Sequence, residues 1–301
     1  MTTLKPTVSV VIPCHNYGRY LADAIASALA QTHPPSQIIV IDDGSTDNTR
    51  EIAQQHPAPV EYFALPHSGV SRARNEGLRR VTSDFVVFLD ADDALDPQYL
   101  EKTLEAWKSA NEPKPAFVYT QRVDFESVTS IYRYPDFDPV LLKFKNYIMV
   151  SALLRTELAR AQEFDPLFAG GLEDYDFFLG LVEKGYSGLL LNQPLLRVRK
   201  HAGSRTITSA GPSIRWEIMC LLLNKHQSLY SRQDRHLFMQ RLRHFVADRL
   251  LEQQYPAQPT SARLAALGQM IRYRSPLPAI LSQLRFITCL PATPVEESPH
   301  A

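Results

Sequence analysis

The chain is poor in cysteine and has no long apolar run. Its 301 residues include three cysteines, at Cys14, Cys220 and Cys289. Cysteines so far apart indicate neither a metal-binding cluster nor a disulfide framework, and they suit a reducing compartment. No run approaches the ~20 apolar residues that span a bilayer. No separate secretory segment precedes the first strand-like run. We therefore expect a cytoplasmic protein.

The chain also lacks an excess of charge of either sign. Lysine plus arginine number 32, and aspartate plus glutamate number 32. This balance excludes a global attraction to nucleic acid, so any site for a polyanion must be local. Hydrophobic residues make up 45% of the chain, which is enough for a packed core. We find no internal repeat and no low-complexity segment.

Short apolar runs alternate with helical patterns in the front half of the chain. This alternation is typical of an α/β fold with a mostly parallel central sheet flanked by helices. We expect Asp96 to cap a helix that has Pro97 as its first residue. The expected strands are residues 8–12, 38–41, 60–64 and 85–89, and the expected helices are about 20–30, 47–53, 69–81 and 96–107.

The rest of the chain is less regular and becomes helical after Pro212. We expect strands at residues 117–123, 146–150, 189–191 and 195–198, and a helix at about 174–184. We divide the chain into a domain at 1–212 and a C-terminal helical extension at 213–301, frayed from about 291. Within the domain, we expect a nucleotide-binding half at about 1–95 and an acceptor half at about 96–212.

Two of the expected strands end in clusters of carboxylates. One cluster is Asp42-Asp43-Gly44-Ser45, and the other is Asp90-Ala91-Asp92-Asp93. In an open parallel sheet, ligands bind outside the carboxyl ends of the strands. Mg²⁺ and Mn²⁺ prefer such oxygen ligands, shared with substrate phosphates. The alternative is that both segments are solvated turns that cap the next helices. The clusters contain more acids than capping needs.

Arg74 lies near the start of an expected helix, where the helix dipole disfavours a cation. It is therefore a candidate ligand-binding or ion-pair residue. Glu173 and Asp174 stand at the start of a later helix, where acids either complement the dipole or include a general base. His15 has a ring that can stack on a base, but a lone loop histidine is usually only solvated. For His201, the sequence supports two interpretations equally: a metal ligand, or a residue of a polar loop.

Taken in order, these segments resemble the inverting nucleotide-sugar glycosyltransferases of family 2, which have the GT-A fold. The resemblance covers roughly residues 7–205. It is carried by Val8-Ser9-Val10-Val11-Ile12-Pro13-Cys14-His15-Asn16, Ser27-x-x-x-Gln31-Thr32, Asp42-Asp43-Gly44-Ser45-Thr46-Asp47, Gly69-Val70-Ser71-x-Ala73-Arg74-Asn75-x-Gly77, Leu89-Asp90-Ala91-Asp92-Asp93 and Gly171-Leu172-Glu173-Asp174-Tyr175-Asp176.

The resemblance implies a role for each matching residue. Asp174 would be the general base, with Glu173 supporting it or contacting the acceptor. The metal, Mn²⁺ or Mg²⁺, would be bound by Asp92, with His201 as a second metal or diphosphate contact. The nucleotide would be bound by Pro13, His15, Asp43, Arg74 and Asp90. His15 replaces the aromatic ring often found there, which alters base stacking.

By the same resemblance, the donor is a nucleotide sugar, most commonly a UDP-sugar, and the acceptor is a hydroxyl, in some members on a lipid-linked glycan. The chain lacks the Gln-x-x-Arg-Trp motif of processive synthases, which favours addition of a single sugar. Two other hypotheses remain open. They are a nucleotidyltransferase, which would need a Gly-rich loop after the first strand, and a non-catalytic domain that binds a sugar nucleotide or a partner.

Five arginines accompany an apolar stripe in the C-terminal region. Basic amphipathic helices of this kind bind anionic lipid at the inner face of a membrane. An ordinary packed helix with a solvated basic face is the alternative. The arginines are Arg232, Arg235, Arg241, Arg243 and Arg249.

Overall fold

A computed structural model of the chain describes residues 5–168, 171–201 and 212–239. The chain divides into two compact units, Met1–Ser231 and Arg232–Ala301. All strands described below belong to the first unit. The expectations for residues 240–301, including the frayed end and three of the five arginines, lie outside the described residues. No helix within the described ranges is both long and apolar enough to cross a membrane.

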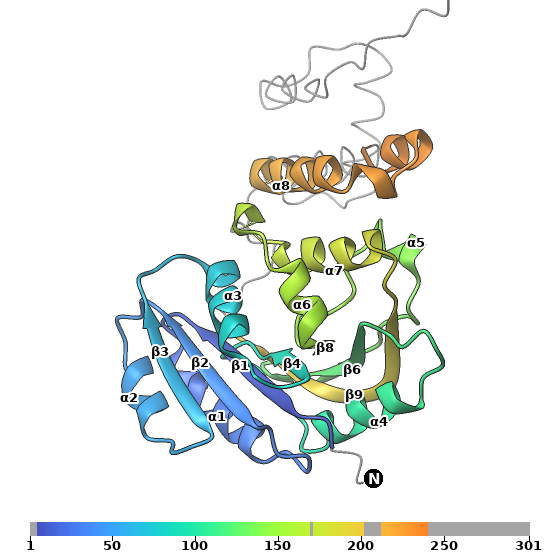
Figure 1. The fold of residues 1–301 in the computed structure, drawn as a ribbon. Helices are drawn as coiled ribbons and strands as arrows, with labels where there is room; N and C mark the ends of the chain where they lie inside the picture. The colour runs from blue at the N-terminus through green and yellow to red at the C-terminus, as the bar shows by residue number, and fades with distance from the viewer. Residues whose placement is uncertain (1–4, 169–170, 202–211, 240–301) are drawn as a thin grey trace, which may run out of the picture. The chain divides into compact units, whose positions relative to one another are not determined.

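The strands in the described part of the chain form one nine-stranded sheet (Figure 1). They are β1 (Val8–Cys14), β2 (Gln37–Asp43), β3 (Val60–Leu65), β4 (Phe85–Phe88), β5 (Ala94–Leu95), β6 (Phe117–Glu126), β7 (Ser130–Tyr132), β8 (Leu153–Arg155) and β9 (Gly188–Lys200). Their order is β3-β2-β1-β4-β8-β6-β9-β5, and β7 pairs with β6.

The front half of the sheet is parallel throughout. β1 pairs in parallel with β2 and β4, and β2 pairs in parallel with β3. Cys14, the last residue of β1, lies opposite Asp42 of β2, so these two strands end at the same edge. Beyond β4 the sheet is mixed, because β8 is antiparallel to both of its neighbours whereas β6 and β9 are parallel. The expected α/β fold is confirmed, with a sheet that is parallel in its front half and mixed beyond β4.

Two strand predictions in the second half were wrong. Residues 146–150 form a loop, and the strand is β8, three residues after it. The loop carries buried Tyr147, Ile148 and Val150, which explains its strand-like apolarity. Residues 188–200 form one strand rather than two. Its pairing with β6 shifts register on both sides of Pro194, so the missing N–H of this proline falls at an irregularity of the ladder.

The expected cap at Asp96 was also wrong. The helix begins at Tyr99 with Gln98 as its N-cap. Asp96 instead accepts a hydrogen bond from the Gln98 amide at 3.0 Å, one turn before the helix. The helices are α1 (Gly18–Leu29), α2 (Thr49–Gln54), α3 (Val70–Arg80), α4 (Tyr99–Ser109), α5 (Pro139–Leu142), α6 (Thr156–Gln162), α7 (Glu173–Glu183) and α8 (Pro212–Lys225).

Each face of the sheet is covered by its own helices and hydrophobic core. Helices α1 and α4 cover one face, and α3, α6 and α7 cover the other (Figure 1). Buried side chains of the two sets belong to separate cores. Alternate residues of β1 point into the two cores: Val10 packs in the core on the α1 and α4 side, and Val11 packs in the core on the α3, α6 and α7 side. This is the period expected of a strand that is buried on both sides.

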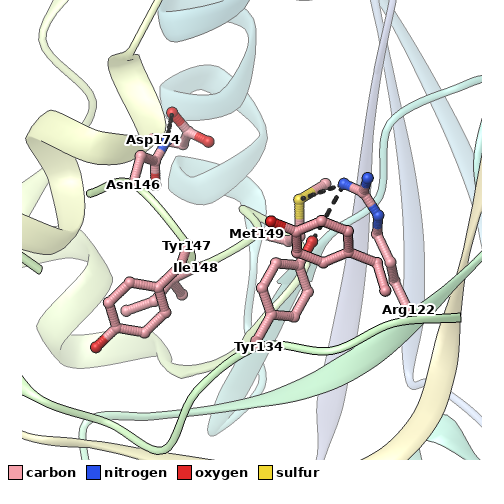
Figure 2. Close-up of a pocket in the computed structure, with 8 residues that line it drawn as sticks. Arg122, Tyr134, Asn146, Tyr147, Ile148, Met149 and Asp174 are labelled. Carbon is pink, nitrogen blue, oxygen red and sulfur yellow. Dashed lines mark hydrogen bonds between the residues drawn. The ribbon is translucent and has the colours of Figure 1, made fainter. Parts of the chain in front are cut away.

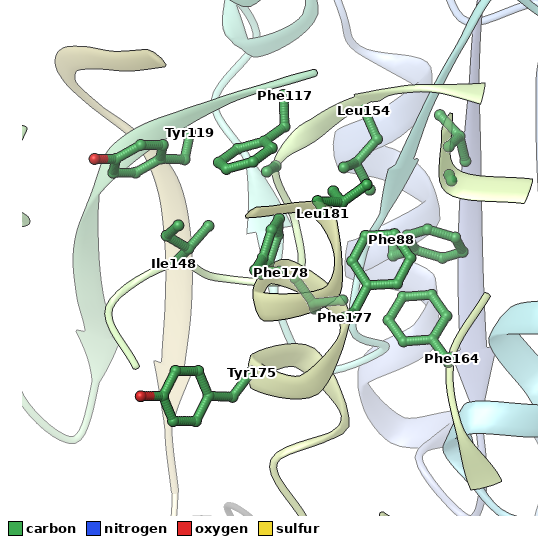
Figure 3. Close-up of a cluster of buried hydrophobic side chains, with 14 of the residues drawn as sticks. Phe88, Phe117, Tyr119, Ile148, Leu154, Phe164, Tyr175, Phe177, Phe178 and Leu181 are labelled. Atoms are coloured by element: carbon green, nitrogen blue, oxygen red, sulfur yellow. The ribbon is translucent and has the colours of Figure 1, made fainter. Parts of the chain in front are cut away.

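Aromatic rings fix α7 against the sheet (Figure 3). Phe177 of α7 stacks on Phe164 with ring centroids 4.5 Å apart, and Phe164 packs edge-on against Phe88 of β4 at 5.0 Å. Phe178 contacts Phe117 of β6 at 4.9 Å. Burial of such rings contributes much of a core's stability. It also fixes the position of the first turn of α7, which carries Glu173 and Asp174.

A buried ionic cluster joins α7 to the last residue of α8 and to the residue that follows it. Asp176 is fully buried and lies 2.9 Å from both His226 Nε2 and Lys225 Nζ. His226 Nδ1 lies 2.9 Å from Glu183 at the other end of α7. Carboxylates that are removed from water require such partners. The cluster therefore ties α7 to the end of α8 and the residue after it at two points.

Candidate functional site

The carboxylate at the end of β2 fixes the start of α3. Asp43 Oδ1 accepts hydrogen bonds from the amide and hydroxyl of Ser68, at 2.7 and 3.0 Å. Asp43 Oδ2 accepts from the Gly69 amide at 2.9 Å. Gly69 has a φ of +93°, which favours glycine, and it directly precedes α3. The β2 carboxylate thus sets the position of a helix whose first turns carry Arg74.

Arg74 connects the end of the β4 segment to the start of α7. Its side chain is 3% exposed and donates to Asp90 Oδ1 and to Glu173 Oε1, each at 2.8 Å. A charge this deeply buried requires such pairing. In the same helix, Asn75 exchanges two 2.8 Å hydrogen bonds with the backbone of Phe164, shortly before α7. Segments 16 and 99 residues from Arg74 therefore meet at one point.

Asp174 follows Glu173 in the first turn of α7. Leu172, the residue directly before α7, has a φ of +67°. This left-handed conformation is uncommon for a bulky side chain and recurs at functional sites. Asp174 Oδ1 accepts from Asn146 Nδ2 at 3.2 Å and from the Tyr175 amide at 2.7 Å. Burial raises the pKa of Asp174 to about 7, and repulsion from Glu173 adds to the rise.

The acids after β4 have few positive partners. Asp92 Oδ2 lies 3.1 Å from His201 Nε2, and Asp93 accepts from the Arg199 amide at 3.0 Å. Burial raises the pKa of Asp92 and of Asp93, and repulsion from Asp90 raises both further. Oxygen-rich sites with unbalanced negative charge match the preferences of Mg²⁺ and Mn²⁺. The donor set around Asp92 and His201 therefore fits a divalent cation.

Two histidines flank the end of β2. The rings of His15 and His67 stack with centroids 4.2 Å apart, and both Nδ1 atoms lie near the Asp43 carbonyl oxygen, at 2.7 and 3.0 Å. Potential ligand atoms of His15, Asp43 and His67 all lie within 4.8 Å of one another. Because a carbonyl oxygen only accepts, each Nδ1 acts as a donor there, and the Nδ1 of His67 also lies 3.0 Å from Asp43 Oδ2. Pro13 is buried in β1, opposite Ile41.

A pocket of about 160 Å³ opens beside Asp174 (Figure 2). Asn146 and Asp174 lie together on one side of it, and Arg122, Tyr134 and Met149 lie on the other (Figure 2). Tyr132, Tyr147 and Ile148 complete the lining.

The structure thus brings the sequence-predicted residues into three groups of contacts. Asp43 holds the loop that starts α3, and α3 carries Arg74. Arg74 in turn contacts both Asp90 and Glu173, and Asp92 pairs with His201.

The sequence-based prediction missed His67, Asn146 and the tyrosines of the pocket. Each stands in a loop or at a sheet edge without a recognisable motif. A histidine directly before the Ser68-Gly69 turn is the only local signal that His67 offered.

Comparison with known proteins identifies the family. The model of glycosyl transferase family 2 matches residues 9–165, just over half of the chain. A putative teichuronic acid biosynthesis glycosyltransferase, TuaG of Bacillus subtilis, is 42% identical over 109 residues, which are 35% of this chain and 43% of that protein. Chondroitin synthase of Escherichia coli is 28% identical over 71% of this chain and 31% of its own length. The matches thus span less than half of these relatives.

Solved structures show the same fold. TarS of S. aureus in complex with UDP-GlcNAc aligns with a TM-score of 0.61 and 18% identity over 81% of this chain and 71% of that one. The mannosyltransferase PcManGT of Pyrobaculum calidifontis, in complex with GDP-Man and Mn²⁺, aligns with a TM-score of 0.55 and 19% identity over 95% and 81% of the two chains. The GT-A architecture is confirmed, and the chain belongs to glycosyl transferase family 2.

Proposed function

We propose that this protein transfers a single sugar from a nucleotide-diphosphate sugar to a hydroxyl acceptor, with inversion at the anomeric carbon. The observation that carries the proposal is Asp174. Asp174 lines a pocket, and its pKa is raised to about 7. It directly follows Glu173, which forms an ion pair with Arg74, and Arg74 also pairs with Asp90 at the end of the β4 segment. A carboxylate with a pKa near the working pH is well matched to general base catalysis, which contributes ~10²–10⁴-fold.

Asp174 takes the proton of the acceptor hydroxyl as that oxygen attacks the anomeric carbon. The hydrogen bond from Asn146 fixes one oxygen of this carboxyl group. Glu173 keeps Arg74 in place and raises the pKa of Asp174 by repulsion. Because attack and departure occur on opposite faces of the sugar, no covalent enzyme intermediate is required.

The nucleotide would lie along the ends of β1 and β2. Pro13 and His15 would line the base pocket, Asp43 and Arg74 would support it, and Asp90 would meet the ribose. Asp43 and Arg74 already have protein partners, so they act largely by ordering the loops around the base. The stacked rings of His15 and His67 offer an aromatic surface at the same place.

Asp92 and His201 would hold a Mn²⁺ or Mg²⁺ ion. When bound, such an ion stabilises the negative charge that develops on the leaving diphosphate, as a Lewis acid. The raised pKa values of Asp92 and Asp93 support this role, because a dication would relieve the repulsion among these acids.

The relatives and structural neighbours support the substrate class. TarS was solved with UDP-GlcNAc and PcManGT with GDP-Man, which supports a nucleotide-sugar donor and leaves UDP-sugars as our first choice. TuaG is named for teichuronic acid biosynthesis and the Escherichia coli relative for chondroitin synthesis, which supports a polysaccharide or glycoconjugate product. We therefore place the reaction in the synthesis of a cell-surface glycan or glycoconjugate. In some members of the family that this chain resembles, the acceptor is a lipid-linked glycan.

The test uses a panel of UDP- and GDP-sugars with Mn²⁺ and the Asp174→Asn variant. Transfer should fall at least ~10²-fold, whereas thermal stabilisation by the nucleotide diphosphate should persist. Glu157→Gln, the same acid-to-amide change at an exposed site on α6, serves as the control. Unchanged transfer in Asp174→Asn would contradict the proposed base. Nucleotide binding without any transfer or hydrolysis by the wild type would favour a non-catalytic binding domain.

A further inference from the structure

The pocket beside Asp174 has two chemically different sides (Figure 2). Asp174 and its hydrogen-bond partner Asn146 form a polar side. Tyr132, Tyr134 and Met149 contribute aromatic and apolar surface to the rest of the lining. The pocket volume of about 160 Å³ is below the ~300–1,000 Å³ that is typical of sites for drug-sized ligands. These dimensions suit one small ring with polar groups on one edge and an apolar face.

Arg122 contacts both tyrosines on the aromatic side of the pocket. Arg122 lies over the Tyr132 ring, 4.6 Å from its centroid, and donates to the Tyr134 hydroxyl at 3.2 Å. The two tyrosine rings are 5.0 Å apart. Tyr132 nevertheless remains 41% exposed, at the β6–β7 hairpin. A prepositioned tyrosine offers a large contact area at a small cost in conformational entropy.

The charges around the pocket disfavour an anionic ligand. Arg122 is the cationic group of the lining, and its Nε lies 2.8 Å from Asp124 Oδ1. Asp124 also lies 3.6 Å from Lys200 Nζ, so this carboxylate is shared between two cations, and the case against an anionic ligand rests on Asp174. On the opposite side, Asp174 becomes an anion as it titrates near neutral pH, and it would repel a second carboxylate.

We infer that this pocket binds the acceptor as an uncharged pyranose ring, with the apolar face of the sugar against Tyr132 and Tyr134 and a hydroxyl directed at Asp174. The inference rests on the proposed function and adds the chemistry of its acceptor. The C–H groups of a sugar ring complement the electron-rich face of tyrosine. In the reaction, the acceptor oxygen bonds to the anomeric carbon, its proton passes to Asp174, and the donor's carbon–oxygen bond breaks with its electron pair leaving on the diphosphate.

Binding is tested without any donor, by saturation-transfer NMR on the full chain. The probes are the methyl glycosides of glucose, galactose, mannose and N-acetylglucosamine, compared with methyl glucuronide. We expect signals from at least one neutral glycoside, weaker signals from the glucuronide, and a several-fold loss of signal in Tyr132→Ala. The control is Tyr186→Ala, a similarly exposed tyrosine (37%) after the other end of α7. Equal signals in the two variants, no signal from any neutral glycoside, or preference for the glucuronide would overturn the inference.

Kinetics separates this inference from the proposed function. Release of nucleotide diphosphate by the wild type without acceptor tests the donor chemistry alone. With the acceptor identified by NMR, Tyr132→Ala should raise its KM about tenfold with a smaller effect on kcat, as expected when binding is uniformly weakened. An unchanged KM would contradict the acceptor role of Tyr132 even if transfer occurs. Glycoside binding without donor turnover would instead contradict the proposed function.

Discussion

Arg74 of α3 and Glu173 of α7 form a 2.8 Å ion pair between residues that are 99 positions apart in the chain. The same guanidinium reaches Asp90 after β4. Because Asp174 directly follows Glu173, this pair links the expected base to the strand-end acids. The position of the first turn of α7 therefore depends on a side chain from the opposite half of the domain.

Replacing Glu173 by glutamine should destabilise the fold. Arg74 would keep Asp90 but lose one of its two anionic partners while it remains buried. We expect a loss of about 2 kcal/mol in the free energy of unfolding, below the 3–5 kcal/mol of a fully broken buried pair. Urea denaturation measures it, with Glu105→Gln on the surface of α4 as the control. Equal denaturation midpoints for the two variants would contradict a structural role for the Arg74–Glu173 pair.

Transfer should depend on pH through Asp174. Burial raises its pKa to about 7, and the proposed base acts in its deprotonated form. The rate should therefore fall as the pH drops through about 7 and level off at higher pH. In Glu173→Gln the repulsion that helps to raise this pKa is gone, so the midpoint should move to lower pH. Rate–pH profiles at saturating substrate give the midpoint for the wild type and for the variant. A midpoint that is unchanged or higher in Glu173→Gln would argue against the electrostatic coupling between Glu173 and Asp174.

Two neighbouring acids after β4 should differ in their effect on metal binding. Asp92 is partly exposed and pairs with His201, whereas Asp93 is buried and accepts a backbone hydrogen bond from Arg199. Asp92→Asn should weaken Mn²⁺ binding by at least about tenfold. Asp93→Asn should affect it less, because the Asp93 side chain faces the protein. Calorimetric titration with Mn²⁺ in the presence of nucleotide diphosphate compares the two, and a larger defect in Asp93→Asn would reverse the assignment.

The buried cluster around Asp176 should contribute strongly to stability. His226→Ala removes the imidazole that bridges Asp176 and Glu183. Asp176 would keep only Lys225 among these partners while it remains fully buried. We expect a loss of about 3 kcal/mol in the free energy of unfolding. The control is Asp165→Asn, which removes an outer partner of Lys225 and should cost less. Thermal and urea unfolding compare the variants, and equal losses would show that the buried bridge is no stronger than the outer pair.

The sequence predicted the parts of the fold that depend on local pattern. The parallel front strands were found because each is a short apolar run, and two of these runs lead into acids, such as Asp43 at the end of β2. Residues 146–150 misled the prediction because a buried loop and a buried strand are equally apolar. Asp96 misled it because an acid before a proline also suits a turn.

The contacts within the candidate site were beyond sequence reasoning. The two partners of Arg74 come from distant segments, so spacing along the chain cannot identify them. Tyr132 and Tyr134 reach the pocket through the β6–β7 hairpin, whose register depends on pairing rather than on a motif.

The hydrogen bonds of Asp43 have a practical consequence for altering donor preference. Both of its oxygens already hold the turn before α3, so a change at this position would shift Arg74 and the start of α7 together with the proposed base pocket. His67, by contrast, has a side chain that is 62% exposed and stacks on His15. Under the proposed function, engineering of base selectivity is therefore best begun at His67, where a new side chain would face the proposed base pocket while the scaffold beneath it stays intact.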